Sequence, residues 1–479
     1  MKNITKYILI FWVAIAFSCS DSIMDEIDTN PNVFSDAPLN TLLPNVITRY
    51  TTEVAGGATA RTARFLSEQT TFVLGGPILD GLSSNSTLWQ SGYLALNDLE
   101  IIKKKAQESG AWAYVGISGV LKAFYLSNIT DLYGDVPYSE ALRPEIVNPR
   151  FDSSESIYAE LQNILDEAIT NLEKDPGLII PRNDDMIFNG NRAMWIKTAY
   201  GLKARLHNRL SNIDPQGSAN KALEAIGKSF STENERFMFS KFENTLNNGN
   251  PHSLAQNAQP MTSVGNGIFN AMLFFSPNGN VEDDPRANIW FTRVKGKLLP
   301  APNGTAVSDF QEPRLDGAFY SKPEILKHFG APKPLLTFVE IKFIEAECYL
   351  RLGNPQSAYA SYQTALSAAL KEASIFRPAV ALSPKQMSDY ISLPTVSPGI
   401  GSLTQKTVVY QKYIYFFLYQ PIEAYNEFRR TGLFAVTDPG GSATRFPYPI
   451  IELTRNRNTP TGIDDFTILN RSTKLFWAK

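Results

Sequence analysis

The sequence contains few of the residues on which metal sites and acid–base catalysis most often depend. Among its 479 residues are 3 histidines and 2 cysteines. His207, His252 and His328 lie far apart and have no metal-ligand spacing. The sequence has no phosphate-binding P-loop, no H-E-x-x-H helix and no G-x-S-x-G turn. We therefore predict a protein that is not an enzyme and uses no metal or cofactor.

Carboxylate pairs are present, but their spacing does not define a catalytic site. Asp184 is adjacent to Asp185, and Asp283 is adjacent to Asp284. Glycoside hydrolysis needs two carboxylates at a set separation in space, which neighbouring positions do not establish. Asp284 also precedes Pro285, where an acid commonly begins a turn or a helix. A surface glycosidase with scattered carboxylates stays an alternative to a binding protein.

The chain has no excess of positive charge. It carries 45 Lys and Arg against 47 Asp and Glu, a formal net charge of −2. Nucleic-acid binding relies on clustered basic residues that displace counterions. The only dense basic cluster is Lys103–Lys105, which is typical of the solvated end of a helix. These features exclude nucleic acid as a predicted partner.

The sequence also has no apolar run long enough to span a bilayer, which takes about 20 residues. Its longest run near the N-terminus, Tyr7–Phe17, follows Lys2 and Lys6 and precedes Cys19. This order of a basic start, a short apolar stretch and a cleavage region is typical of a secretory signal.

The residues at the predicted cleavage site, Ala16, Phe17, Ser18 and Cys19, are similar to a bacterial lipobox. We predict a signal peptide over 1–18, lipidation of Cys19, and an acidic, proline-containing tether over 19–37. A plain signal peptide followed by a coincidental cysteine is the alternative. The other cysteine, Cys348, lies in a helical pattern, where a thiol usually acts as a small buried hydrophobe.

From residue 38 onward, apolar residues recur at intervals of three and four, which predicts a mostly α chain. One helix pair fits the spacing of a tetratricopeptide unit, with small residues at the helix crossing and aromatics at the stacking positions. Its matching residues are Ala346, Tyr349, Ala358, Tyr362 and Ala365. Other pairs match more loosely, so we predict a helical-repeat scaffold. Generic helix-hairpin packing is the alternative.

Two regions interrupt the helical pattern, at about 244–334 and about 376–407. The first is rich in Asn, Gly and Pro yet also contains aromatic residues, which argue against disorder. Aromatic rings among polar side chains are the usual composition of a small-ligand site. The predicted ligand contacts, in or beside the loop-rich regions, are Asn85, Trp89, Phe275 and Trp290. For Trp89, a core position four residues before Tyr93 is the alternative.

The stretch "DLYGDVPYSEAL", which begins at Asp131, predicts a structural joint between helices. Gly134 permits a left-handed turn and Pro137 fixes the exit of the chain. Asp131 and Asp135 can accept hydrogen bonds from nearby backbone amides. The tyrosines of the stretch can pack against the next helix pair.

The sequence resembles the SusD/RagB family of outer-membrane nutrient-binding lipoproteins, and the resemblance covers nearly the whole chain. The phrases that carry it include "DEIDTNPN", "LLPNV", "DLYGDVPYSEAL", "EDDPR", "EAYNEFRRTG" and "RFPYPIIELTRN", in the order of the family. The chain departs from the family in having Ala16 at the lipobox position of the usual Leu. It also has Phe476 where a second Trp normally precedes Trp477.

The resemblance implies one α-rich SusD-like domain over 38–479, with tetratricopeptide-like helix pairs on one side and a variable ligand-binding side. It implies a lipid-anchored protein in the outer membrane, facing the cell exterior. Such proteins capture glycans, or in some members peptides, and deliver them to a SusC-like TonB-dependent transporter. They are not enzymes. The residues themselves leave a peptide-binding member and a protein-binding repeat scaffold open as alternatives.

Overall fold

The structure is a computed structural model. It describes residues 37–55, 57–72, 86–258, 262–302, 320–375, 377–418, 420–434, 443–460 and 474–478. The N-terminal helices are α3 (Leu39–Arg49), α4 (Ala58–Leu66), α5 (Ser86–Glu108), α6 (Trp112–Tyr133), α7 (Ser154–Glu173), α8 (Arg192–Arg209) and α9 (Pro215–Ile226). The later helices are α10 (Pro251–Ala258), α11 (Asn266–Leu273), α12 (Pro285–Trp290), α13 (Phe338–Arg351), α14 (Pro355–Glu372), α15 (Pro384–Ile391), α16 (Gln405–Phe416), α17 (Pro421–Thr431) and α18 (Ile450–Arg455).

The strands are short and pair only as three small antiparallel ladders in the described chain. Their bounds are β1 (Thr70–Phe72) with β5 (Thr262–Val264), β2 (Val136–Pro137) with β3 (Phe151–Asp152), and β4 (Arg236–Phe239) with β6 (Lys333–Thr337). The prediction of a mostly α fold is confirmed. Where the structure describes them, both regions predicted as loop-rich consist mainly of short helices and turns, and the first also contains strand β5 and the start of β6.

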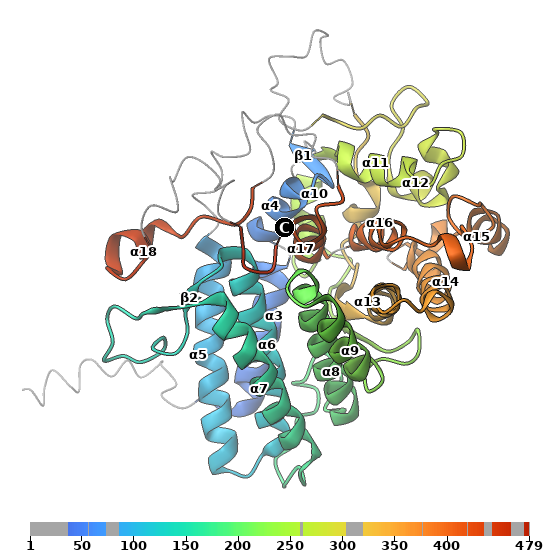
Figure 1. The fold of residues 1–479 in the computed structure, drawn as a ribbon. Coiled ribbons are helices and arrows are strands. Elements are labelled where there is room, and N and C mark those ends of the chain that lie inside the picture. Colours follow the sequence, from blue (N-terminus) through green and yellow to red (C-terminus); the bar gives the residue numbers. More distant parts are fainter. Residues whose placement is uncertain are drawn as a thin grey trace, which may run out of the picture.

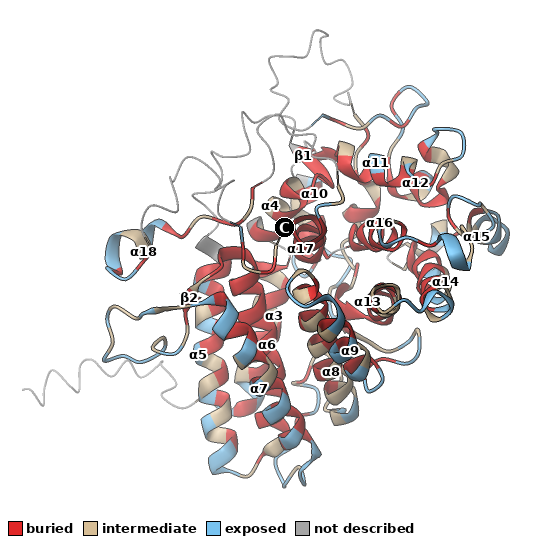
Figure 2. Ribbon diagram, viewed as in Figure 1, coloured by how far each residue is buried: buried red, intermediate tan, exposed pale blue. Residues whose placement is uncertain are grey.

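Long helices α5, α6 and α7 lie side by side along one flank of the molecule (Figure 1). Glycines in α6 allow this close packing. A Cβ placed on Gly119 would lie 2.8 Å from the Cβ of Ala168 in α7, and one on Gly116 would lie 2.4 Å from Cγ of Leu172. The helix backbones therefore approach more closely than larger residues would permit. In Figure 2 the sides of α5 and α7 that face α6 are buried and their outer sides are exposed, whereas α6 has no exposed residue.

The predicted repeat unit is the hairpin of α13 and α14. Ala346, Ala358, Tyr362 and Ala365 are all completely buried in it. Gly353 makes the turn in the left-handed region, with φ of 71°. The side chain of Asn354 caps α14 by accepting a hydrogen bond from Ser357 N at 3.1 Å. The helix pair is therefore present, and its assignment as a tetratricopeptide unit stays a prediction.

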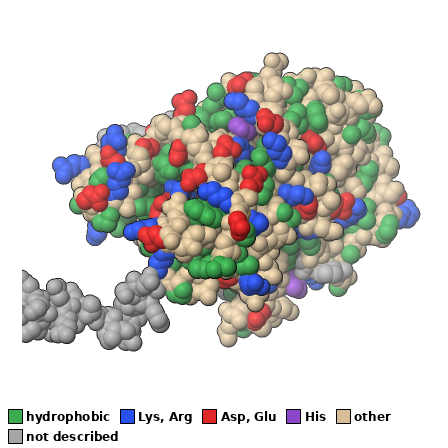
Figure 3. All heavy atoms as spheres, turned by 90° about the horizontal axis from the view of Figure 1, so that it is seen from below, with side chains coloured by type: hydrophobic (Ala, Val, Ile, Leu, Met, Phe, Trp, Pro, Cys, Tyr) green, Lys and Arg blue, Asp and Glu red, His purple; other side chains and the backbone are tan. Residues whose placement is uncertain are grey.

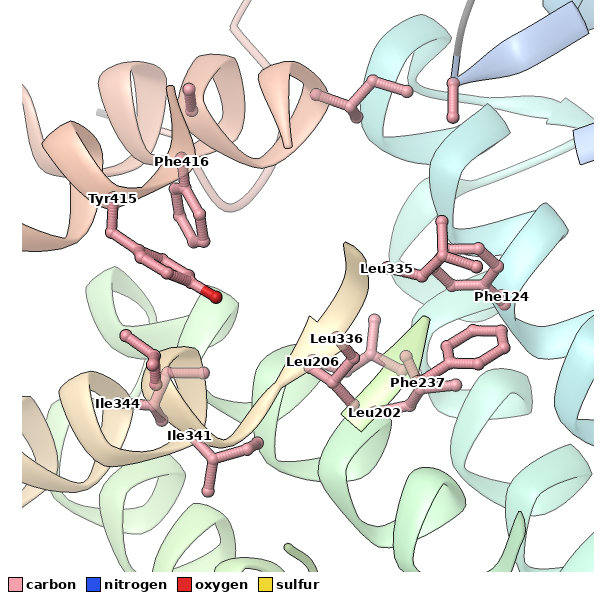
Figure 4. Close-up of a cluster of buried hydrophobic side chains, with 14 of the residues drawn as sticks. Phe124, Leu202, Leu206, Phe237, Leu335, Leu336, Ile341, Ile344, Tyr415 and Phe416 are labelled. Carbon is pink, nitrogen blue, oxygen red and sulfur yellow. The ribbon is translucent and has the colours of Figure 1, made fainter. Parts of the chain in front are cut away.

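The β4–β6 ladder lies in the hydrophobic core between the N-terminal helices and the later helices α13 and α16. Phe237 of β4 is buried against Phe124 of α6, with ring centroids 5.2 Å apart in an edge-to-face arrangement. Figure 4 shows Leu202 and Leu206 of α8 beside Phe237 and Leu336. One continuous apolar core therefore runs from the N-terminal helices to α13 and α16.

A cluster of buried charges joins helices that are distant in sequence. Arg205 of α8 makes two hydrogen bonds to the carboxylate of Glu340 in α13, at 2.6 and 2.7 Å. Arg430 of α17 contacts Glu347 of α13 at 2.6 Å and also Glu427 of its own helix at 2.5 Å. The cluster, which we call the buried ion cluster, comprises Asp131, Arg205, Arg209, Glu340, Glu347, Lys412, Glu423, Glu427 and Arg430.

The predicted joint at "DLYGDVPYSEAL" is a structural junction, and its two aspartates act differently. Asp135 accepts a hydrogen bond from the backbone N of Ser154 at 2.7 Å, at the start of α7. Asp131 instead belongs to the buried ion cluster, where it contacts Arg209 at 3.4 Å and accepts a hydrogen bond from Tyr158. Gly134 has φ of 84°, in the left-handed region. The expected contact with a nearby backbone amide therefore holds for Asp135 and is wrong for Asp131.

Candidate ligand-binding pocket

A pocket of about 450 Å³ opens where the chain leaves the joint and passes over α5 and α6. Its volume falls within the range of about 300 to 1,000 Å³ that is usual for small-ligand sites. The lining residues are Tyr93, Leu96, Glu100, Lys122, Pro137, Tyr138, Ser139, Ala141, Leu142 and Arg143. The pocket thus combines two tyrosines, aliphatic groups and charged side chains.

The wall formed by residues 138–143 is held in place by the β2–β3 ladder. The carboxylate of Asp152, in β3, accepts hydrogen bonds from the backbone N of Tyr138 at 2.9 Å and of Ser139 at 2.7 Å. It also accepts one from Ser139 Oγ at 2.7 Å. Beyond this point Leu142 adopts φ of 62°, which non-glycine residues seldom adopt. This wall is therefore a turn that hydrogen bonds hold in a locally strained backbone conformation, and such strain is common at binding sites.

Tyr93 forms the side of the pocket that faces the core. Its hydroxyl donates a hydrogen bond to the carbonyl oxygen of Pro137 at 2.6 Å, which fixes the ring against the turn. Burial raises the pKa of Tyr93 well above its ordinary value, so the hydroxyl stays protonated at neutral pH. Tyr93 thus offers a ligand the exposed part of its ring, while its hydroxyl is already engaged.

An ion pair between Lys122 and Glu100 lies on the floor of the pocket. Nζ of Lys122 is 2.6 Å from Oε1 of Glu100 and 5.2 Å from the ring centroid of Tyr138. Burial disfavours the cation, but Tyr138 and Glu100 outweigh this effect and raise the pKa of Lys122. Burial in turn raises the pKa of the Tyr138 hydroxyl. The floor therefore presents a charged donor and a charged acceptor close to an aromatic ring.

A smaller hollow of about 80 Å³ continues from the pocket along α5, α6 and α7. Glu100 and Lys122 line both spaces. Ser118 and Glu160 add a hydroxyl and a carboxylate to the walls of the hollow. The two spaces are therefore adjacent, with aromatic rings lining the larger one and polar groups lining both.

Trp89, predicted to contact a ligand, lies directly behind the pocket. Its ring packs against Tyr93 at 5.1 Å and meets Tyr133 edge-to-face at 5.0 Å between centroids. Its Nε1 donates a hydrogen bond to Oε1 of Glu452 at 3.2 Å. Because its side chain is 4% exposed, Trp89 supports Tyr93 from the core side.

Two other predicted contacts, Phe275 and Trp290, are fully buried on the far side of the molecule. Trp290 stacks on Phe417 with centroids 5.5 Å apart, and its Nε1 donates to the carbonyl oxygen of Ala373 at 2.8 Å. In this structure a ligand at the surface does not reach either ring. The structure does not bring them together with Trp89. Asn85 and Cys19 lie outside the described residues.

Tyr93, Lys122 and Tyr138 were not among the site residues predicted from the sequence. Tyr138 lies in the joint, to which we assigned only structural packing. The overlooked signal was the density of tyrosine, proline and charge in that stretch, which serves both the joint and the pocket wall. Lys122 carries no such signal, because a single lysine in a helix is usually a solvated surface residue.

Within the described residues, no group of three or more His, Cys, Asp or Glu side chains is placed to hold a metal ion. Cys348 is buried, and burial raises the pKa of its thiol to about 11. The thiolate, which is the nucleophilic form, is therefore scarce at neutral pH. No described helix is both long and apolar enough to cross a membrane.

Several solved structures share this fold. A SusD/RagB family protein from Bacteroides thetaiotaomicron aligns with a TM-score of 0.79 and 23% sequence identity, covering 92% of this chain and 99% of that chain. A chitin-binding SusD homolog from Flavobacterium johnsoniae aligns with a TM-score of 0.73 and 17% identity, covering 91% and 98%. A SusD homolog from Bacteroides fragilis aligns with a TM-score of 0.73 and 18% sequence identity, covering 92% of this chain and 99% of that chain.

A search of curated protein sequences found no match. A comparison with protein-family models does identify the family. The family model described as "Starch-binding associating with outer membrane" matches residues 31–449, which is most of the chain. The chain therefore belongs to the SusD-like family of outer-membrane-associated starch-binding proteins.

Proposed function

We propose that this protein is a lipid-anchored receptor on the cell exterior that captures an oligosaccharide and delivers it to a SusC-like TonB-dependent transporter. The observation that carries the proposal is the family match over residues 31–449. The chitin-binding SusD homolog that shares the fold adds support for a glycan ligand. The predicted signal peptide and Cys19 provide the anchor in the outer membrane.

The candidate pocket supports this function through its chemistry. Aromatic rings bind the apolar faces of sugars, and polar side chains then pair with the hydroxyl groups. Tyr138 and Tyr93 supply rings, whereas Lys122 and Glu100 supply a donor and an acceptor on the floor. In our proposal one sugar unit occupies the pocket of about 450 Å³, and the next unit extends towards the adjoining hollow.

Calorimetry with the purified mature protein tests the ligand class. Starch-derived and chitin-derived oligosaccharides are titrated separately, and each is recovered afterwards to measure new reducing ends. The proposal expects saturable binding of at least one glycan with no new reducing ends. Release of reducing sugar would instead favour the glycosidase alternative. Binding of peptides alone, with no glycan bound, would favour the peptide-binding alternative.

The location of the site is tested separately with Tyr138→Ala. Tyr359→Ala is the matched control, because this tyrosine is also only partly exposed but lies on α14, away from the pocket. We expect weaker binding in Tyr138→Ala and unchanged binding in Tyr359→Ala. Equal binding in both variants would place the glycan elsewhere and leave the receptor function standing.

A further inference from the structure

The turn between α7 and α8 exposes three consecutive aliphatic side chains. Leu178, Ile179 and Ile180 are 101%, 46% and 37% exposed. Leaving such side chains in water is unfavourable by about 25 cal/mol for each Å² of apolar surface. Contiguous exposed apolar residues with polar neighbours commonly mark a contact with a protein or a membrane.

This turn is held firmly at its base, so the exposed residues form a defined tip. Nη1 of Arg192 donates to the carbonyl oxygens of Leu172 at 2.8 Å and Lys174 at 2.6 Å, which fastens the two helix ends together. Tyr114 of α6 donates from its hydroxyl to Oδ2 of Asp184 at 2.7 Å. These hydrogen bonds therefore hold the turn in a position that leaves Leu178–Ile180 exposed to solvent.

Aromatic and basic side chains surround the tip. Nζ of Lys174 lies 3.9 Å from the ring centroid of Trp112, at the start of α6. Arg182, two residues after Ile180 in the same connection, is exposed. An apolar tip above tryptophan, lysine and arginine has the composition of a surface that rests in the interfacial layer of a bilayer.

The basic cluster Lys103–Lys105 lies at the same end of the molecule. A Cβ placed on Gly177 would be 2.5 Å from the carbonyl oxygen of Gly110, so the turn touches the loop that follows α5. Lys104 is exposed there. The acidic residues Glu108, Glu173 and Asp175 are exposed at this end too. Figure 3, which views the molecule from below, shows both signs of charge among hydrophobic side chains.

The described chain begins at this end. Nζ of Lys105 donates a hydrogen bond to the carbonyl oxygen of Ala37 at 2.6 Å, which places the last residue of the predicted tether beside the end of α5. The tether therefore enters the fold on the face that carries the apolar tip. From Ser20 to Asp36 the chain can reach about 60 Å when extended, at roughly 3.5 Å per residue. Anchoring through such a tether keeps the nearest face at high effective concentration against the bilayer.

We propose that this face, formed by Leu178–Ile180, Trp112, Lys174 and Lys104, rests on the lipid surface to which the tether is attached. Apolar insertion of the tip is its main attraction, because the charges at this end are of both signs. The inference rests on the anchoring step of the proposed function. It adds a second membrane contact, which fixes the orientation of the pocket above the bilayer.

Fluorescence quenching by lipids tests the contact. In the mature chain from Ser20, a hexahistidine sequence replaces residues 1–19 and holds the protein on vesicles of phosphatidylcholine, phosphatidylglycerol and a nickel-chelating lipid. Ile179→Cys carries an environment-sensitive fluorophore, and brominated acyl chains act as quenchers. Cys348 is buried, which favours labelling at the introduced cysteine. The control is Ser388→Cys in α15, an exposed position far from the tip.

Strong quenching at position 179 with little at 388 is the expected result. Adding Leu178→Asp and Ile180→Asp should then reduce quenching at 179 by at least about tenfold, since each apolar side chain lost from the bilayer weakens partitioning. Absence of quenching at 179 on vesicles that hold the protein would overturn the inference, as would equal quenching at both positions. A tip that meets a partner protein instead would stay unquenched on these protein-free vesicles. Because the nickel lipid holds the chain, the result does not depend on lipidation of Cys19.

Discussion

The molecule uses the same chemistry, ion pairs between basic side chains and carboxylates, in two regions with opposite consequences. In the buried ion cluster, the side chains of Lys412 and Glu347 are 1% and 0% exposed. On the floor of the pocket, Lys122 and Glu100 are 18% and 41% exposed. The first set is sealed from solvent and ties α8, α13, α16 and α17 together. The second lines a pocket with room for a ligand. Under our proposal, the degree of burial separates a structural ion pair from a ligand-binding one.

We expect the largest loss of stability when a basic side chain is removed from the buried ion cluster. Arg430→Ala leaves Glu347 and Glu427 without a principal buried partner, so we expect a loss of about 3 to 5 kcal/mol in the free energy of unfolding. Urea denaturation measures it. Arg293→Ala is the matched control, because Arg293 and Glu282 form an exposed pair at 2.7 Å. That control should lose less than about 1 kcal/mol. Similar losses in both variants would contradict the comparison.

The joint offers a comparison within one short stretch. Asp131→Ala removes a buried carboxylate from Arg209, Tyr158 and Asn426, and we expect it to cost about 3 kcal/mol of stability. Asp135→Ala removes one hydrogen bond to the start of α7 and should cost about 1 kcal/mol. Thermal unfolding of both variants measures the difference. Unchanged melting with lost ligand binding would show that the joint acts in recognition instead.

Acid should destabilise the cluster in a defined pH window. Neighbouring arginines and Lys412 outweigh the effect of burial and lower the pKa values of Glu347, Glu423 and Glu427 below their ordinary value of 4.5. The stability from these groups is complete above pH 4.5 and is lost as pH falls towards their folded pKa values. Each excess proton bound by the unfolded chain changes stability by about 1.4 kcal/mol per pH unit.

Denaturation between pH 7 and pH 3 measures this loss, and Glu427→Gln should make the slope below pH 4.5 shallower. The pKa of Glu372 shifts in the opposite direction, because burial raises it above its ordinary value. The folded state binds this proton at a higher pH than the unfolded chain does, so Glu372 adds stability as pH falls towards 4.5 and adds no slope below it. Glu372→Gln should therefore remove that gain above pH 4.5. Equal slopes in wild type and Glu427→Gln would exclude Glu427 as a source of the acid sensitivity.

The smallest effects are expected at the pocket, and they should appear in binding more than in stability. Lys122→Met keeps the length and apolar contacts of the side chain but removes its charge. We expect glycan affinity to fall by about tenfold, which corresponds to about 1.4 kcal/mol. The free energy of unfolding should change by less than about 1 kcal/mol, because the pair with Glu100 is partly exposed. Calorimetry and urea denaturation of the same preparation separate the two quantities. A large stability loss with unchanged affinity would make this pair structural.

Much of the scaffold could be predicted from sequence because its determinants are local. The spacing of Ala346, Ala358, Tyr362 and Ala365 predicted a helix hairpin, and Gly353 marked its turn. Gly134 marked the left-handed turn of the joint in the same way. Each of these signals lies within a few residues of the structure that it specifies.

The pocket could not be predicted in this way because its parts are brought together by the fold. Trp89 and Trp290 have the same local appearance, an aromatic residue beside a polar segment. Only the packed structure places Trp290 on Phe417 and joins Trp89 to Glu452. Asp131 also looks like a turn residue, and its buried partners Arg209 and Arg429 come from distant helices. Burial of a single side chain depends on such long-range contacts.

Delivery to a transporter is tested by purifying the protein from its native outer membrane in mild detergent and identifying the proteins that accompany it by mass spectrometry. Our account predicts a large TonB-dependent transporter in near-equal amount, together with an acylated N-terminal peptide that begins at Cys19. Recovery of the protein alone, or with soluble partners only, would contradict delivery to a transporter. It would identify the protein as an independent surface binder.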